Sequence, residues 1–337
     1  MGSKAKQIVT DSRREIVQGL IDMMESGKLD WSRGWSIAAL LPQNPVSGVT
    51  YNGGNRMRLM YDAMTHGYDD PRYMTYVQAQ QKGWQVKRGA KGRLCEKWIF
   101  EKMEEQENKE TGRKEKVVVS LAHPMVSYFY VYHASDIEGI VPYVSPNKDH
   151  SLNEMIDLLI RASPCQVKEI MQGKAYYSPS DDTIVMPPRA FFDTDADFIK
   201  TLAHEEGHST GAQWRLNRQI KNSFGTEDYA REELVAELCS LFLTADLGLP
   251  TDGKVAENTA AYLQSWIKAL KKDPDVLFTA SSDAEKAAGM IKKNFEREMK
   301  LKEKAGPNQA NSKELSDQTE AVEETDDNVS IASYRVL

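Results

Sequence analysis

The spacing of apolar side chains in the first part of the chain predicts helices. Between residues 12 and 24, apolar positions recur every three or four residues, which places them on one face of an amphipathic helix. These positions are Ile16, Val17, Leu20, Ile21 and Met24. Gly27 follows where a C-terminal glycine cap belongs. We expect two further helices, at about 55–66 and 75–82, each closed by a glycine.

Beyond Gly83 apolar positions alternate with polar ones, a period that is typical of β-strands. The expected strands are 84–87, 94–100, 117–121 and 126–132. Residues 101–116 hold 11 charged side chains among 16 positions. So many charges favour a solvated hairpin tip or a mobile loop. The pattern therefore predicts an α+β domain over residues 1–140.

A second domain is expected after a short polar linker at 141–150. The pattern then predicts an amphipathic helix at 152–162, a hairpin at 175–187 and several later helices. We place this domain at 151–303. The remaining segment, 304–337, has few large apolar residues, and we expect a disordered acidic tail there. The fold class predicted for the chain is α+β, with two domains and a tail.

Charge is distributed unevenly along the chain. The net charge is −7, but residues 1–100 contain 15 Lys and Arg against 9 Asp and Glu. That balance of +6 leaves −13 for the other residues. A basic first part favours contact with a polyanion, and random variation of surface charge is the alternative.

Cysteine usage and hydropathy bear on the compartment. Cys95, Cys165 and Cys239 form no Cys-x-x-Cys pair and are odd in number, so a disulfide framework is not expected and a reducing cytoplasm fits best. The first residues lack the apolar core of a signal peptide, and no apolar run is long enough to span a bilayer. We expect a cytoplasmic protein without membrane contact.

The sequence His-Glu-Glu-Gly-His at 204–208 is the strongest chemical signal in the chain. On a helix, residues i and i+4 share one face, so His204 and His208 can ligate a single ion. Glu205 projects beside that ion, where a carboxylate can take a proton from zinc-bound water. Gly207 permits close approach of a neighbouring backbone. The pattern predicts a Zn²⁺ site of the metallopeptidase type, and two surface histidines on an ordinary helix are the alternative.

A third protein ligand must be a carboxylate, because no histidine follows His208. A second helix is expected from about residue 226, and its spacing resembles that of the gluzincin metallopeptidases. In that class a glutamate of the later helix binds zinc, and a carboxylate one turn further on orients a histidine ligand. The resemblance implies that Glu233 is the ligand and Glu237 the orienting partner. Glu232 is the weaker candidate because it points about a hundred degrees away, and a solvated helix face is the alternative for each glutamate.

Gluzincins also use an edge strand above the zinc helix, where an extended substrate adds as a further strand. Thr183–Met186 precedes the motif in the right order for this role, and an ordinary core hairpin is the alternative. The phenol of Tyr177 or Tyr229 could stabilise an oxyanion, although most tyrosines only pack.

Seven short motifs follow one another along the chain: Tyr51–Arg56, Asp70–Thr75, Gln78–Val86, Met186–Arg189, His204–Gly211, Arg215–Arg218 and Tyr229–Leu238. In this order they resemble the ArdC-like antirestriction family of plasmids and phages, and the resemblance covers about residues 8–300. It implies an N-terminal domain that binds single-stranded DNA and a C-terminal zincin-like domain. It also implies a role on mobile elements, where incoming DNA is protected from host restriction.

Basic and aromatic side chains of the first domain are the candidates for DNA contact. A basic groove with aromatic platforms is what single-strand binding requires. The candidates are Tyr51, Asn55, Arg56, Arg72, Lys82, Trp84, Lys87, Arg88 and Lys91. Aromatic residues in alternating strands can equally be core residues, and that alternative stays open for Trp84.

Three functions are compatible with these features. The protein could be a protease that cuts a DNA-bound or regulatory protein, such as a host restriction enzyme. It could be a DNA-binding shield in which zinc only supports folding. It could also be an interaction module that acts through its acidic C-terminal half. For the biological effect we favour the shield over the protease and the protease over the module, and we still expect a chemically competent site.

Overall fold

The computed structural model describes residues 2–27, 40–107, 113–144, 151–218, 220, 226–250 and 259–305. The tail expected at 304–337 lies outside these ranges apart from its first two residues, as does the part of the expected linker at 145–150. No helix in the described ranges is long and apolar enough to cross a bilayer. Helices and strands are mixed in the chain, as the predicted α+β class requires.

The N-terminal part contains the three expected helices, and the first of them begins at Gly2, well before the apolar stripe at 12–24. They are α1 (Gly2–Glu25), α3 (Gly53–His66) and α4 (Tyr76–Gln81). The strands are β1 (Tyr73–Met74), β2 (Gln85–Val86), β3 (Arg93–Glu107), β4 (Lys114–His133) and β5 (Ile137–Glu138), with a 3-10 turn at Ala134–Asp136 between the last two. β1, β4 and β3 form one antiparallel sheet, and β2 pairs with β5. A capping box between Thr75 and Gln78 fixes the start of α4.

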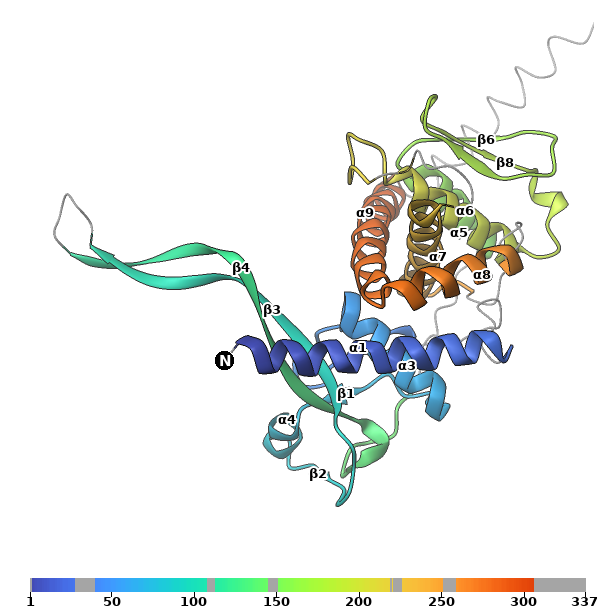
Figure 1. Cartoon of the computed structure of the whole chain (residues 1–337). Coiled ribbons are helices and arrows are strands. Elements are labelled where there is room, and N and C mark those ends of the chain that lie inside the picture. Colours follow the sequence, from blue (N-terminus) through green and yellow to red (C-terminus); the bar gives the residue numbers. More distant parts are fainter. Residues whose placement is uncertain are drawn as a thin grey trace, which may run out of the picture.

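Strands β3 and β4 form a long antiparallel hairpin that projects from the body of the molecule (Figure 1). The strands run to Glu107 and from Lys114, so the loop or hairpin tip expected at 101–116 is largely strand. Opposite charges across the ladder, such as Glu105 beside Lys116, support pairing there. Of the two alternatives expected there, the solvated hairpin agrees with the described residues. Its strands extend further than a tip would, because a high charge content does not exclude a strand whose two faces are both in water.

The C-terminal part is a group of helices with a small sheet packed on one side, against the helix Asp195–Ser209 (Figure 1). The helices are α5 (Leu152–Ala162), α6 (Asp195–Ser209), α7 (Glu227–Leu247), α8 (Thr259–Lys272) and α9 (Asp275–Ala305), with a 3-10 turn, η2, at Arg189–Phe191. The strands are β6 (Gln166–Glu169), β7 (Tyr176–Ser178) and β8 (Thr183–Met186), in the order β6-β8-β7. β8 is therefore the central strand, and all four of its residues are buried. The edge-strand role considered for Thr183–Met186 is wrong, and the core-hairpin alternative holds.

One hydrophobic core joins the two parts of the chain. Helices α1 and α3 lie below α8 and α9 in Figure 1, and their apolar faces enter the same buried cluster as α5 to α9. Leu20 and Ile21 from α1, Met57 from α3, Phe242 from α7 and Ile291 from α9 are all members of this cluster. The N-terminal helices therefore help to support the helices that carry the candidate site.

Arg56 of α3 lies inside this junction and is fully buried. Its guanidinium pairs with Asp246 at 3.0 Å and Glu285 at 3.2 Å, and it stacks over the ring of Phe242. A buried arginine needs such partners, because an unpaired charge in a core is costly. Arg56 is thus a structural residue that ties α3 to α7 and α9, and the expectation that it contacts DNA is wrong.

Candidate metal centre and nucleic-acid surface

Helix α6 carries the His-Glu-x-x-His sequence at its buried C-terminal end. Thr194 caps the helix by accepting a hydrogen bond from the amide of Asp197 at 3.1 Å, and acidic residues in the first turn favour the helix dipole. Phe198 and Leu202 anchor one face in the core. The cap and this apolar face fix the rotation of α6, and so the direction in which its histidines point.

Helix α7 packs closely against α6 and brings the carboxylates. It begins after the N-cap Thr226 and ends at Gly248, which adopts the left-handed conformation. A side chain at Gly207 would lie only 3.2 Å from both Ala236 and Cys239 of α7. The two helices can therefore approach this closely only because residue 207 is glycine, which confirms the role predicted for it.

The two histidines of α6 and one glutamate of α7 converge on a single point. Nε2 of His204 lies 3.5 Å from one carboxylate oxygen of Glu233, and Nε2 of His208 lies 3.6 Å from the other. One nitrogen or oxygen from each residue can be chosen so that all lie within 4.8 Å of one another. Two imidazoles and a carboxylate at this spacing form a donor set that fits a divalent cation.

Each imidazole has a second carboxylate on its other nitrogen. Nδ1 of His204 lies 3.6 Å from Glu237, slightly beyond hydrogen-bond distance, and Glu237 pairs with Lys200 at 3.1 Å. Nδ1 of His208 lies 3.3 Å from Glu232. The structure thus places Glu237 where the sequence analysis expected an orienting partner. Glu232, considered there only as a ligand, lies on the far side of His208 from Glu233.

Glu232 is itself held by an arginine outside the two helices. Arg218 donates to its two carboxylate oxygens at 2.8 and 3.0 Å and also to the carbonyl of Gly207 at 2.8 Å. This bidentate contact fixes the carboxylate that faces Nδ1 of His208. Arg218 was not predicted as part of this site, although it lies in the Arg215–Arg218 motif, because nothing in the linear pattern pairs it with α7.

Burial and charge shift the pKa values of this cluster in opposite directions. Burial alone lowers the pKa of His204, but the carboxylates of Glu233 and Glu237 outweigh it and raise that pKa well above 6.5. The pKa of His208 is also raised, because Glu233 and Glu232 outweigh the effect of burial. Burial raises the pKa of Glu233, but the nearby histidines lower it to about 2. The cluster therefore attracts positive charge strongly.

A cavity of about 270 Å³ opens onto these ligands. Glu205 lines it together with His204, His208 and Glu233, so the structure places all the predicted chemical groups at one site. Tyr176 and Tyr177 of β7 form part of the wall, and Tyr229 of α7 forms another part beside Glu233. The strand that borders the cavity from an edge position is β7, not β8.

Three of the predicted DNA contacts are occupied within the fold. The side-chain amide of Asn55 exchanges two hydrogen bonds of 2.8 Å with the backbone of Glu96. The hydroxyl of Tyr51 donates to a backbone carbonyl of β1 at 3.1 Å, and Arg72 pairs with Asp70 at 2.7 Å. These side chains are half-buried, and their polar groups stabilise the N-terminal part.

The other basic candidates share one exposed region around β2. Lys82, Lys87, Arg88 and Lys91 are all exposed. Lys87 and Arg88 also line a cavity of about 530 Å³ whose wall includes two tyrosines, Tyr76 and Tyr132. Trp84 is half-buried and packs against a small apolar cluster beneath this region. Its ring therefore serves mainly in packing, which is the core-residue alternative stated for it above.

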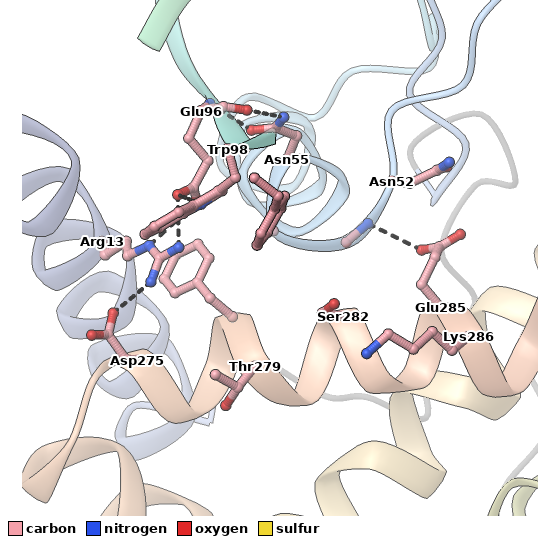
Figure 2. A pocket seen from close by; sticks show the side chains of 14 residues that line it. Arg13, Asn52, Asn55, Glu96, Trp98, Asp275, Thr279, Ser282, Glu285 and Lys286 are labelled. Carbon is pink, nitrogen blue, oxygen red and sulfur yellow. Dashed lines mark hydrogen bonds and ion pairs between the residues drawn. The ribbon is translucent and has the colours of Figure 1, made fainter. Parts of the chain in front are cut away.

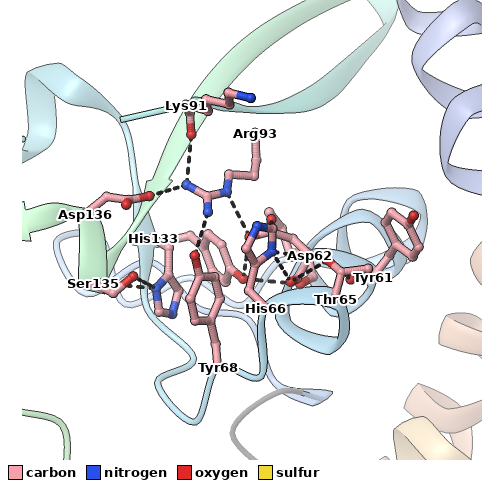
Figure 3. A network of polar contacts seen from close by, with 12 residues as sticks. Tyr61, Asp62, Thr65, His66, Tyr68, Lys91, Arg93, His133, Ser135 and Asp136 are labelled. Carbon is pink, nitrogen blue, oxygen red and sulfur yellow. Dashed lines mark hydrogen bonds and ion pairs between the residues drawn. The ribbon is translucent and has the colours of Figure 1, made fainter. Parts of the chain in front are cut away.

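A network centred on Arg93 anchors the turn that carries these charges (Figure 3). Arg93 pairs with Asp62 at 2.8 Å and with Asp136, and it donates to the hydroxyl of Tyr68 at 2.9 Å. It also donates to the carbonyl of Lys91 at 2.8 Å, while the ammonium of Lys91 points away from the network. The Arg93 network therefore fixes the backbone at Lys91 and leaves the ammonium group pointing away from the network.

Comparison with known proteins assigns both parts of the chain. Residues 10–132 match the N-terminal domain of the anti-restriction factor ArdC, and residues 154–283 match a zincin-like metallopeptidase domain. A DNA primase TraC of Escherichia coli is 35% identical over 82% of this chain. The chain spans only 26% of the length of that primase.

Two crystal structures have the same fold. The metal-free antirestriction protein ArdC from the R388 plasmid is 31% identical, with a TM-score of 0.65, and the match covers 85% of this chain and 98% of that one. The Mn(II)-bound form of that protein gives a TM-score of 0.66 at 31% identity, covering 84% of this chain and 97% of that one. With both domains matched in order, this chain belongs to the ArdC-like antirestriction family and carries a zincin-like metallopeptidase domain.

Proposed function

We propose that this protein is an antirestriction factor that binds single-stranded DNA through its N-terminal part and holds Zn²⁺ at a hydrolytic site. The observation that carries the proposal is the convergence of His204, His208 and Glu233 at the floor of a cavity that Glu205 also lines. We place the boundary between the two functional regions at 141–150. The three cysteines are unpaired thiols, in keeping with a cytoplasmic site of action.

The donor set favours zinc among the divalent metals. Two imidazoles and one carboxylate, with a position left open toward a cavity, are the usual ligands of a catalytic zinc ion. The partners on the outer nitrogens, Glu237 and Glu232, would orient the two rings and increase their basicity. The relative from the R388 plasmid has a Mn(II)-bound form, which supports divalent metal binding in this fold.

The chain's own groups supply the rest of an amide hydrolysis. A bound divalent cation would polarise the substrate carbonyl and acidify water. Glu205 would accept the proton of the attacking water and pass it to the leaving amine as the C–N bond breaks. Tyr229, whose side chain contacts Glu233 in the cavity wall, could donate its hydroxyl to the developing oxyanion once Glu233 is engaged by the cation. The substrate would be a protein, such as a host restriction enzyme bound to the entering DNA.

The metal part of this proposal is tested by titration of chelator-treated protein with Zn²⁺. We expect one equivalent per chain, because the described residues contain a single cluster with this geometry. Isothermal calorimetry gives the stoichiometry, and mass spectrometry of the native protein checks it. Zinc binding that is absent, or that survives in His204→Ala with unchanged affinity, would contradict the proposed site.

The DNA part is tested on the exposed basic region. Each lysine or arginine that neutralises a phosphate adds about one unit to the slope of log K against log salt. We expect the triple variant Lys87→Ala, Arg88→Ala, Lys91→Ala to bind labelled single strands more weakly and to lower that slope by about two to three. Fluorescence polarisation at several salt concentrations measures both quantities.

The exposed lysines of the hairpin arm provide a control for that variant. Lys102→Ala, Lys114→Ala, Lys116→Ala removes the same number of charges from exposed positions of β3 and β4. We expect it to leave the salt slope unchanged. Equal effects of the two triple variants would mean that only overall charge matters, and the region around β2 would then not be the binding surface.

The shield function remains a second candidate, because the cluster lies between two core helices. His204 and Glu233 are buried where α6 and α7 pack together, so a metal there would also cross-link the core. A metal with only this role would stabilise the fold without hydrolysis. The two candidates differ in what they require of Glu205.

A further inference from the structure

A third cavity lies at the junction of the two parts of the chain, separate from the metal centre and from the region around β2. Its volume is about 650 Å³, and it is enclosed by α1, α3, β3 and α9 (Figure 2). Its aromatic lining residues are Trp98 and Phe100 of β3 and Phe278 of α9, and the polar residues Asn52, Thr279 and Ser282 also line it. The cavity therefore joins the region matched to the ArdC N-terminal domain to the last helix of the chain's core.

Two aromatic side chains on β3 are exposed where they line this cavity. Trp98 is 39% exposed and Phe100 is 61% exposed, although both are large apolar residues. Both belong to β3 and lie two residues apart. Leaving two aromatic rings in water costs hydrophobic free energy that burial elsewhere would recover. Neighbouring exposed rings in a cavity are therefore a feature of binding sites.

The larger ring is held in a fixed position. The indole nitrogen of Trp98 donates to Glu96 at 2.9 Å, and the guanidinium of Arg13 lies 5.7 Å from the indole centre. Arg13 is fixed in turn by Glu96 at 2.6 Å and by Asp275 at 2.7 Å. Figure 2 shows this chain of contacts from α9 through Arg13 to Trp98. The indole is thus a preorganised platform, and little side-chain entropy is lost when a ligand stacks on it.

The charges around the cavity are neutralised inside the protein. Glu96 and Asp275 both pair with Arg13, and Glu285 pairs with Arg56 at 3.2 Å. Lys286 lies 3.1 Å from Asp283. With its carboxylates paired, the cavity does not suit an ammonium group, and its half-buried cation, Arg13, is already held by two carboxylates. It suits a flat, uncharged ring with polar edges.

The rim offers hydrogen bonds to such edges. Asn52 can both donate and accept through its exposed amide, and the hydroxyl of Ser282 on α9 can do the same. Gly54 allows α3 to pack closely against Phe278 and Glu96, because a Cβ atom at this position would lie only 3.0 Å from Phe278 and 3.1 Å from Glu96. Aromatic faces with a few polar groups at the margin are the usual composition of a site for a nucleobase.

We propose that this cavity binds one unpaired base of a single-stranded DNA, stacked on Trp98 and Phe100. The inference rests on the proposed single-strand binding and adds a site where bases, not phosphates, are recognised. A base inside a duplex could not enter, because its faces are already stacked. The cavity therefore distinguishes single strands from duplexes, whereas the basic region around β2 would bind the phosphates of either.

The first test compares intact and abasic strands of equal length with the full-length protein. Fluorescence polarisation is measured with a labelled oligothymidylate and with a labelled abasic sugar-phosphate strand. We expect Phe100→Ala and Trp98→Ala to weaken binding of the intact strand about 5- to 100-fold, the range for loss of base stacking. Binding of the abasic strand and the salt slope should not change, because no phosphate contact is lost.

A matched variant separates the cavity from a general effect of lost aromatic surface. Phe191 of η2 is 55% exposed and lies outside the cavity, so Phe191→Ala removes an equally exposed ring elsewhere. It should bind both strands as the wild type does. Thr279→Trp, which adds a bulky ring to an exposed position of α9, should block the cavity and weaken binding of the intact strand only.

The second test does not depend on the stability of any variant. Strands that contain 5-iodouracil are cross-linked by light to the wild-type protein, and the modified peptide is identified by mass spectrometry. We expect the cross-link at Trp98 or Phe100. A wild type that binds neither strand would overturn single-strand binding itself. Wild-type binding with cross-links confined to other residues, and with no effect of Phe100→Ala or Thr279→Trp, would overturn only the base site.

Discussion

Replacing Glu205 with glutamine is expected to lower the hydrolytic activity of the metal-loaded protein by about 10²- to 10⁴-fold, the usual contribution of a positioned proton acceptor. Glutamine keeps the shape of the side chain but cannot accept the proton of an attacking water. Glu205 is not among the residues whose nitrogen and oxygen atoms converge on the metal position, so zinc content should stay at one equivalent. Cleavage of a proteome-derived peptide library, followed by mass spectrometry, measures the activity without a known substrate.

The neighbouring residue provides a matched control. Glu206 lies on the same helix, is fully buried, and is not among the residues that line the cavity of the metal centre. Burial raises the pKa of Glu206 well above its ordinary value and so favours the neutral form, which glutamine matches in shape and charge. Glu206→Gln should therefore retain most of the activity. Equal losses in Glu205→Gln and Glu206→Gln would indicate damage to α6, not loss of a proton acceptor.

The same variant separates the candidate functions in cells. Protection of incoming DNA in a restricting host should fail in Glu205→Gln if the protein acts as a protease. Protection should persist if the protein is a shield whose metal only supports folding, or an interaction module that acts through its acidic half. Transfer of an unmodified plasmid into restricting and non-restricting recipients measures this directly, and the ratio of the two efficiencies removes effects on expression.

The local part of the metal site follows from the sequence because a helix fixes the geometry of nearby residues. The spacing of His204 and His208 places both imidazoles on one face whatever the rest of the fold does. The glycine between them indicates a close neighbour, and α7 is that neighbour. Glu233 lies on a different helix, so its role as a ligand could not be inferred from the histidine spacing. It was inferred from the resemblance to gluzincin metallopeptidases.

Features that depend on long-range packing were not predictable from the pattern. Arg56 looks like a DNA contact in a basic segment, but its burial is decided by Asp246 and Glu285, which are about 190 and 229 residues away. The pairing of Arg218 with Glu232 likewise joins a loop to a helix. The order β6-β8-β7 depends on which strands pair, although the continuous apolar run Ile184–Met186 in β8 is consistent with a strand buried on both faces. In each case the missing information was which surfaces meet.

Replacing Glu233 with alanine is expected to weaken zinc binding by more than about 100-fold, because loss of a direct ligand should exceed the 10- to 100-fold effect of losing an orienting partner. Glu232→Ala and Glu237→Ala, which remove the carboxylates behind His208 and His204, should fall within that smaller range. Competition with a chelating dye of known affinity measures all three. Glu227→Ala, at an exposed position of α7, is the control and should bind zinc normally.

The histidines and carboxylates of the metal centre also predict how zinc binding depends on pH. An imidazolium cannot ligate a metal, so binding must displace any protons on His204 and His208. The pKa values of both histidines are raised in the metal-free chain. As the pH is lowered, the affinity for zinc should therefore start to decrease while the pH is still above 6.5, and it should decrease further at lower pH. The displacement of two protons gives a slope of up to about two log units per pH unit. The charged histidines stabilise the metal-free fold below pH 6.5, and this stabilisation is lost as pH rises through the raised pKa values.

Glu233→Ala should move this decline to lower pH, because its carboxylate raises the pKa of both histidines in addition to serving as a ligand. Removal of an orienting carboxylate should have a smaller effect on the pH at which zinc affinity declines. In Glu237→Ala, His204 is the only one of the two histidines that loses a neighbouring carboxylate, and the ligand set is still complete. If Glu232→Ala weakened zinc binding more than Glu233→Ala did, the ligand would be Glu232, and α7 would have to rotate about its axis to present it. The rotation is opposed by Arg218, which holds both oxygens of Glu232 away from the metal position.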